Sequence, residues 1–105
     1  MRMINQNELE TLIRFNAQIH IIDVRKKPAF KKNPAKIAGA VWQDYQDVTT
    51  WADSVSDGRT IICYCVHGHE VSQSVTAQLC TKNMNAYYLQ GGFEAWQERS
   101  GPLSL

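Results

Sequence analysis

The sequence contains no apolar run close to the roughly 20 residues that a membrane-spanning helix needs. Its first ten residues, MRMINQNELE, are too polar for a secretory signal sequence. Neither sign of charge is in excess, because 11 basic and 10 acidic residues leave +1, which argues against global capture of nucleic acid or membrane surfaces. Three cysteines, an odd number, do not fit a disulfide framework. These absences predict a soluble protein of the cytoplasm.

What is present is typical of an ordinary folded domain. Of the 105 residues, 44% are hydrophobic and 20% are charged, which argues against extensive disorder. A chain of this length buries enough surface to fold without a disulfide or a metal, and we expect neither a cofactor nor a metal. No internal repeat, low-complexity segment or linker interrupts it. We therefore predict that residues 1–105 form a single domain.

Two segments have the composition of strands buried on both faces. Residues 19–24 and 60–65 are short, rich in β-branched residues and nearly continuous in apolar character, as in parallel sheets. Shorter strands are predicted at residues 40–42 and 86–89.

Helices are predicted between these strands. Asn5 and Glu8 have the spacing of a capping box, which indicates that a helix begins after Asn5. A helix is also expected over residues 72–83, and a last one after Gly91-Gly92. Alternating strands and helices predict an α/β fold with a parallel sheet. Ligands bind such sheets beyond the carboxyl ends of the strands.

The loop that follows residues 60–65 has the composition of a nucleophile site. Cys65 ends the predicted strand and precedes VHGHEV and a helix, so backbone N–H groups and a helix N-terminus point at one place. A thiol there should ionise more readily than a free cysteine, and Gly68 permits the positive φ that an anion-binding nest requires. The alternative is that Cys65 only packs in the core, as we expect of Cys63 and Cys80.

At this loop the sequence resembles the rhodanese-like domain family, and the resemblance spans almost the whole chain. Four segments carry it in the family's order: IIDVR (residues 21–25), KIAGAVW (36–42), CVHGHEVS (65–72) and YYLQGGFEAW (87–96). In the second segment Lys36 replaces the family's histidine and Ala38 its proline. The resemblance implies a five-stranded, mainly parallel sheet with helices on both faces.

The resemblance also implies a sulfurtransferase. Sulfane sulfur from thiosulfate or a persulfide would pass through a persulfide on Cys65 to a thiol or cyanide, with a protein thiol as a further acceptor. No nucleic-acid or membrane partner is implied. The loop that would hold the persulfide anion through its N–H groups contains Val66, His67, Gly68, His69, Glu70 and Val71.

Within the loop that follows Cys65, two further features depart from the family pattern. The small residue that opens the helix, Ser72, comes seven positions after Cys65 instead of six. Relatives with longer loops include phosphatases and arsenate reductases, but their arginine would fall at Val71, and phosphate would lose its bidentate anchor. The second departure is Glu70, which would make thiosulfate a poor donor if it pointed inward. We expect Glu70 to point outward and to stabilise the start of the helix.

Other interpretations of the loop stay open. His67 and His69 either assist catalysis or point to solvent. The alternation of Cys63, Cys65, His67 and His69 also suits zinc or copper, although structural zinc sites use wider ligand spacing. An alternative function outside enzyme catalysis is also open: the chain would be a non-catalytic rhodanese-like module that carries sulfur, senses it, or binds a protein.

Six of the eleven basic residues lie within residues 25–36, with no acidic residue among them. The segment either draws anionic donors towards the site or is simply a solvated surface. Its prolines, Pro28 and Pro34, predict at most one short helical turn. Asp23 and Arg25 match a family pair that is mostly structural.

Overall fold

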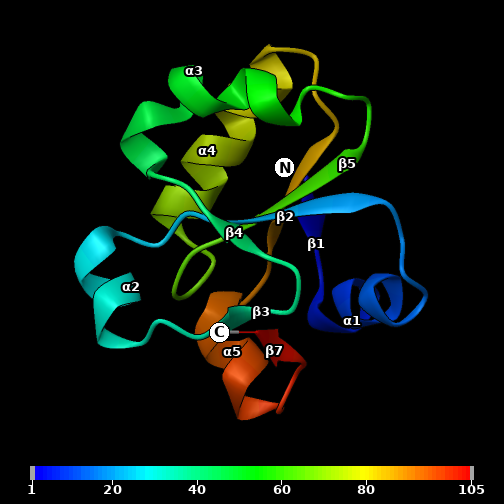
Figure 1. Cartoon of the computed structure of the whole chain (residues 1–105), viewed down its shortest axis with the longest axis vertical. Helices are drawn as coiled ribbons and strands as arrows, with labels where there is room; N and C mark the ends of the chain where they lie inside the picture. The colour runs from blue at the N-terminus through cyan, green and yellow to red at the C-terminus, as the bar shows by residue number, and fades with distance from the viewer. Residues whose placement is uncertain (1, 105) are drawn as a thin grey trace.

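The structure is a computed structural model that describes residues 2–104. Five parallel strands form one sheet in the order β1-β6-β5-β2-β4 (Figure 1). Their bounds are β1 Met3–Ile4, β2 Ile19–Asp23, β4 Val41–Trp42, β5 Thr60–Tyr64 and β6 Ala86–Leu89. The predicted five-stranded parallel sheet is thereby confirmed, with β5 at its centre.

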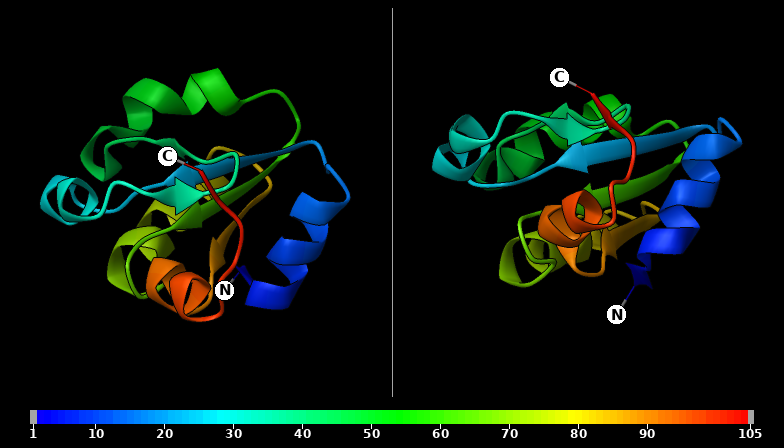
Figure 2. Two further views of the ribbon diagram at one scale, coloured as in Figure 1. Left: turned by 60° about the horizontal axis from the view of Figure 1, so that its bottom comes forward. Right: turned by 90° about the horizontal axis from the view of Figure 1, so that it is seen from below.

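Helices cover both faces of the sheet, as expected, and each face has its own hydrophobic core. Side chains of α3 (Val48–Trp51) and α4 (Glu70–Thr81) pack on one face. Those of α1 (Gln6–Arg14) and α5 (Gly92–Glu98) pack on the other. Figure 2 shows α3 and α1 on opposite sides of the strands. The alternation along β5 divides its side chains between the two cores, since Ile61 and Cys63 belong to one and Ile62 and Tyr64 to the other.

The capping box at the start of α1 is formed as predicted. The Glu8 N–H donates to the Asn5 side chain at 2.8 Å, and the Asn5 N–H donates to the Glu8 carboxylate at 3.0 Å. None of the helices within residues 2–104 has the length and apolar character needed to cross a membrane.

Several boundaries differ from the sequence-based expectations. Helix α4 begins at Glu70 rather than at residue 72, because a carboxylate is favourable in the first turn of a helix. The basic segment forms α2 (Lys27–Lys32), a six-residue helix longer than the single turn expected, since Pro28 lies in the first turn, where proline is tolerated.

A small second sheet is absent from the sequence-based prediction. It pairs β3 (Lys36–Ile37) with β7 (Leu103–Ser104) in antiparallel orientation. Two 3₁₀ helices, η1 (Tyr45–Asp47) and η2 (Ala52–Val55), flank α3. The pairing of β3 with β7 holds the C-terminal segment beside the connection between β2 and β4.

A buried ion pair fixes the segment that follows β2. The Arg25 guanidinium donates to the Asp23 carboxylate at 2.7 Å through one nitrogen and at 3.0 Å through another. It also donates to the carbonyls of Asn33 at 3.0 Å and Ala35 at 2.8 Å. Both charged side chains are almost completely buried. Arg25 therefore ties the chain that follows α2 back to the end of β2.

Replacing Arg25 by glutamine should lower the free energy of unfolding by about 3–5 kcal/mol, because Asp23 would remain buried without its charge partner. Chemical denaturation measures this difference. Arg59→Gln is the matched control: it breaks an exposed ion pair with Asp57 and should cost less than about 1 kcal/mol. Equal losses in the two variants would contradict the structural role assigned to Arg25.

Candidate active site

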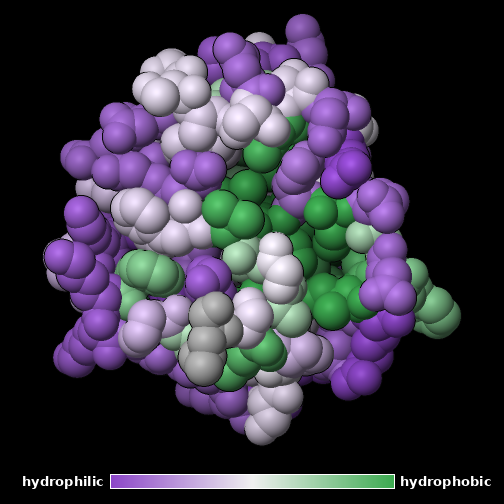
Figure 3. All heavy atoms as spheres, in the orientation of Figure 1, coloured by the Kyte–Doolittle hydropathy of each residue, from purple (hydrophilic) through white to green (hydrophobic). Residues whose placement is uncertain are grey.

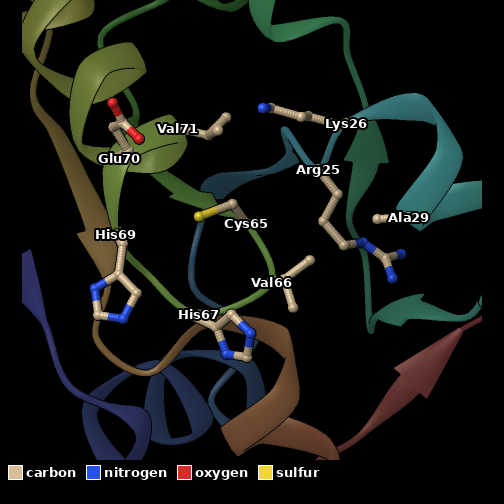
Figure 4. A pocket seen from close by; sticks show the side chains of 9 residues that line it. All are labelled: Arg25, Lys26, Ala29, Cys65, Val66, His67, His69, Glu70 and Val71. Carbon is tan, nitrogen blue, oxygen red and sulfur yellow. The ribbon is translucent and has the colours of Figure 1, made fainter.

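The central strand β5 carries Cys65 to the carboxyl edge of the sheet. Cys65 follows the last residue of the strand and is 7% exposed. It lines a cavity of about 250 Å³ together with Arg25 and Lys26, which follow β2, and Ala29 of α2 (Figure 4). The segments after the two longest strands thus meet at one place, as the rule for parallel sheets predicts.

The loop of residues 65–69, here called the cysteine loop, has its carbonyl groups occupied by neighbouring elements. The Phe93 N–H donates to the Cys65 carbonyl at 2.9 Å, and the Glu94 N–H donates to the Val66 carbonyl at 3.0 Å. The Gln73 side chain donates to the Gly68 carbonyl at 3.1 Å. By contrast, none of the N–H groups of residues 66–71 donates to an acceptor in the part of the chain that the structure describes. These N–H groups remain available to an anion.

Two glycines allow α5 to approach the cysteine loop this closely. Gly92 has φ +62°, and a Cβ placed on it would lie 2.5 Å from the Cys65 carbonyl oxygen and 2.6 Å from that of Val66. Gly68 has φ +75°, and its Cβ would lie 2.6 Å from the Leu89 carbonyl oxygen. Any side chain at either position would displace backbone atoms, so these sites require glycine.

Ser72 contacts the candidate nucleophile, a role that the sequence analysis missed. The Cys65 thiol lies 3.1 Å from the Ser72 hydroxyl, and Ser72 is completely buried. A serine hydroxyl can accept from a thiol or donate to a thiolate, so this contact serves either form of Cys65. The available signal was the spacing of seven residues, which places Ser72 in the first turn of α4.

The two loop histidines lie at the rim and are exposed. The His67 Nδ1 atom lies 3.6 Å from a carboxylate oxygen of Glu94, and the rings of His67 and His69 are 6.1 Å apart. Figure 4 shows both imidazoles directed away from the Cys65 sulfur. In this arrangement they border the cavity without contacting the thiol.

The cavity has few free charges for a compact anion. Arg25 lines it, but its guanidinium is engaged by Asp23 and two carbonyls. Val71 occupies the position where a phosphate-binding arginine would be required, and it leaves an apolar wall. Lys26 and Glu70, both exposed, bring one charge of each sign to the rim. Glu70 lies in the first turn of α4.

The other cysteines lie outside the cavity. Burial raises the pKa of the Cys63 thiol to about 12, so Cys63 stays protonated at neutral pH. Cys80 is half-buried, with its sulfur 3.5 Å from the Ala86 carbonyl oxygen. Within residues 2–104, no group of three or more histidine, cysteine or acidic side chains is placed to hold a metal ion. The structure therefore does not bring Cys63, Cys65, His67 and His69 together as a ligand set.

Comparisons with known proteins agree with this geometry. The family model described as "Rhodanese-like domain" matches residues 5–99. A rhodanese-related protein from Thermoplasma volcanium has a TM-score of 0.84 at 21% identity, over 100% of this chain and 99% of its own. A protein from Staphylococcus saprophyticus has a TM-score of 0.83 at 23% identity, over 100% of both chains.

A third similar structure is a protein of unknown function from Rhodopseudomonas palustris, described as a possible tyrosine phosphatase. It has a TM-score of 0.89 at 18% identity, over 99% of this chain and 85% of its own. No curated protein matches the chain at a significant level. At these identities the structural likeness establishes the fold.

Gly92→Ala should destabilise the protein by at least about 3 kcal/mol, because the new methyl group would push α5 away from the carbonyls of the cysteine loop. Gly58→Ala is the control: Gly58 also has a positive φ, but open space surrounds it, so only the backbone strain of about 1–2 kcal/mol should appear. Denaturation of both variants decides the matter. Equal losses would show that the close approach of α5 is unimportant.

Thiol alkylation should distinguish the three cysteines. In the native protein, iodoacetamide should modify Cys65 and Cys80 but leave Cys63 untouched between about pH 7 and pH 10, because its raised pKa keeps it protonated and burial shields it. Peptide mass mapping measures the modification at each site, and the unfolded protein serves as a control in which all three react. Rapid native modification of Cys63 would refute this assignment.

Proposed function

Because the chain belongs to the rhodanese-like domain family, we propose that it is a sulfurtransferase that carries sulfane sulfur as a persulfide on Cys65. The observation that carries this proposal is the position of Cys65, which lines a cavity and is followed directly by six residues whose N–H groups have no acceptor in the described part of the chain. Such an arrangement favours a negatively charged sulfur over a neutral one. We also propose that residues 1–105 form a single domain.

In the first half-reaction, the Cys65 thiolate attacks the outer sulfur of the donor, thiosulfate or a persulfide. A bond forms between the Cys65 sulfur and that outer sulfur, while the sulfur–sulfur bond of the donor breaks. The leaving group, sulfite or a thiolate, departs with the electron pair of the broken bond. The product on the protein is a covalent persulfide, and its terminal sulfur carries the negative charge.

In the second half-reaction, an acceptor thiolate or cyanide attacks the terminal sulfur. The bond between the two sulfurs on Cys65 breaks, and its electron pair returns to Cys65 as a thiolate. The Ser72 hydroxyl, 3.1 Å from the Cys65 sulfur, donates to that thiolate as it forms. Ser72 therefore positions and stabilises the leaving sulfur, while the N–H groups of residues 66–71 hold the terminal one. No external oxidant or reductant is consumed.

Phosphatase and oxyanion-reductase activities have less support. One structural neighbour is described as a possible tyrosine phosphatase, but Val71 leaves this chain without an arginine fork at the corresponding loop position. The non-catalytic module remains the competing function, because Glu70 brings negative charge to the rim. The two functions differ in whether Cys65 takes up sulfur.

Treating the protein with thiosulfate or a low-molecular-weight persulfide should increase its intact mass by one sulfur atom, and a reductant should reverse the gain. Cys65→Ser should abolish the gain because the attacking thiolate is lost. Cys80→Ser, which removes a half-buried thiol outside the cavity, should load as the native protein does. Circular dichroism confirms that both variants fold.

Two outcomes would overturn the proposal. If neither donor adds sulfur to the native protein, the chain is a binding module. If the Cys65→Ser variant still gains sulfur while the Cys80→Ser variant does not, another thiol is the nucleophile.

A further inference from the structure

Helix α2 forms a basic wall beside the cavity. Lys26, Lys27, Lys31 and Lys32 are exposed, and the helix contains no acidic residue. Within residues 2–104, none of these lysines forms an ion pair; the acidic partners belong to other basic residues. Figure 3 shows hydrophilic side chains covering the side of the molecule where α2 lies in Figure 1. In a chain of net charge +1, this wall is a local excess of positive charge.

The cavity at Cys65 continues into a second hollow between α2 and α5. This second hollow has a volume of about 520 Å³ and is lined by Lys32 and Asn33 on one side and by Phe93 and Gln97 on the other. Arg25, Ala29 and Val66 line both hollows. The two hollows therefore adjoin, and the pair is here called the groove; it is larger than a compact donor or acceptor such as thiosulfate or cyanide needs.

The lysines of α2 divide between the groove and the outer surface. Lys26, at the N-cap of α2, and Ala29 and Lys32, three residues apart within the helix, all line the groove. Lys27 and Lys31, four residues apart, line neither hollow. The groove is therefore bordered by one lysine near Cys65, at the N-cap of α2, and by a second one farther along, in the last turn of the helix.

The opposite walls carry the other sign of charge. Glu70 of α4 lines the first hollow and Glu94 of α5 the second, and Glu94 lies 3.6 Å from His67. A nucleic acid, with phosphates along its whole length, would place some of them beside these carboxylates. A polypeptide can instead place acidic side chains against α2 and neutral groups against α4 and α5. The groove thus favours a peptide over a nucleic acid.

We propose that this groove binds an acidic polypeptide segment whose cysteine accepts the sulfur from Cys65, with Lys26 contacting an acidic residue near that cysteine and Lys32 contacting one farther along the segment. This inference rests on the proposed sulfurtransferase function and names the class of its acceptor. The acceptor thiolate attacks the terminal sulfur of the Cys65 persulfide, the bond to the Cys65 sulfur breaks with its electron pair, and the partner leaves as a cysteine persulfide.

The test uses synthetic peptides as acceptors and the sulfur-loaded protein as donor. Each peptide has a central cysteine flanked on both sides by two glutamates, two glutamines or two lysines, and rates are compared at equal thiolate concentrations because flanking charge alters thiol ionisation. The glutamate peptide should accept sulfur about tenfold faster than the glutamine peptide at low ionic strength. Added salt should shrink that advantage by screening the lysines. The lysine peptide should be the slowest.

Two double variants of the same helix separate contact from general charge. In Lys26→Gln/Lys32→Gln, the glutamate-to-glutamine rate ratio should fall to about 2 or less. In Lys27→Gln/Lys31→Gln, which removes the same charge from the outer surface of α2, the ratio should keep more than half of its native value, because close pairs outweigh distant ones. The ratio cancels any change in loading or in overall fold.

The outcomes distinguish this inference from the function on which it rests. A native protein that takes up no sulfur overturns both. A protein that loads normally but transfers equally to all three peptides overturns the acidic acceptor alone. An equal fall of the glutamate-to-glutamine rate ratio in both double variants also overturns the acidic acceptor, since the lysines of the groove would then contribute no more than the lysines outside it. Equal peptide rates, with single-stranded DNA bound through Lys26 and Lys32, would assign the wall to nucleic acid.

Discussion

The contact between the first turn of α5 and the cysteine loop is the constraint on which the candidate site depends. The Phe93 N–H donates to the Cys65 carbonyl and the Glu94 N–H donates to the Val66 carbonyl. Gly92, which has no side chain, leaves space for both carbonyl oxygens. Since each peptide unit is planar, fixing its carbonyl also fixes the N–H group of the next residue. The beginning of one helix therefore sets the direction of the groups around Cys65, and this explains why α5 begins with a glycine, Gly92.

Much of the sheet could be predicted from local composition, whereas its margins could not. Strands β2 and β5 are buried on both faces, so their β-branched, apolar sequences identify them. Strands β1, β3 and β7 contain two residues each, too few to show any period. Their positions depend on pairing with residues far along the chain, as Met3 with Tyr88 and Ile37 with Leu103. The sequence predicts that α4 begins at Ser72, the small residue after the loop, whereas Glu70 already lies in the first turn.

The same holds for the candidate site: the local sequence predicts part of it, and the rest depends on contacts between segments far apart in the chain. The position of Cys65 between a buried strand and a helix follows from the sequence alone, and the resemblance to rhodanese-like domains supplies the chemistry expected there. The contact between Cys65 and Ser72 requires the true path of the loop into α4. The occupation of Arg25 by the carbonyls of Asn33 and Ala35 requires the course of the chain after α2. The seven-residue spacing from Cys65 places Ser72 in the first turn of α4, but spacing alone does not reveal either contact, because each depends on how separate segments fold back on β2 and β5.

The sheet ends on both sides in strands of only two residues, β1 and β4. An edge strand exposes unpaired backbone groups that can recruit a strand from another molecule, and the gain from such pairing grows with the length of the edge. Here each edge offers only a few of these groups, while the long strands β2 and β5 lie inside the sheet. The architecture therefore discourages edge-to-edge aggregation, although the apolar strands β2 and β5 would be prone to aggregate if they were exposed.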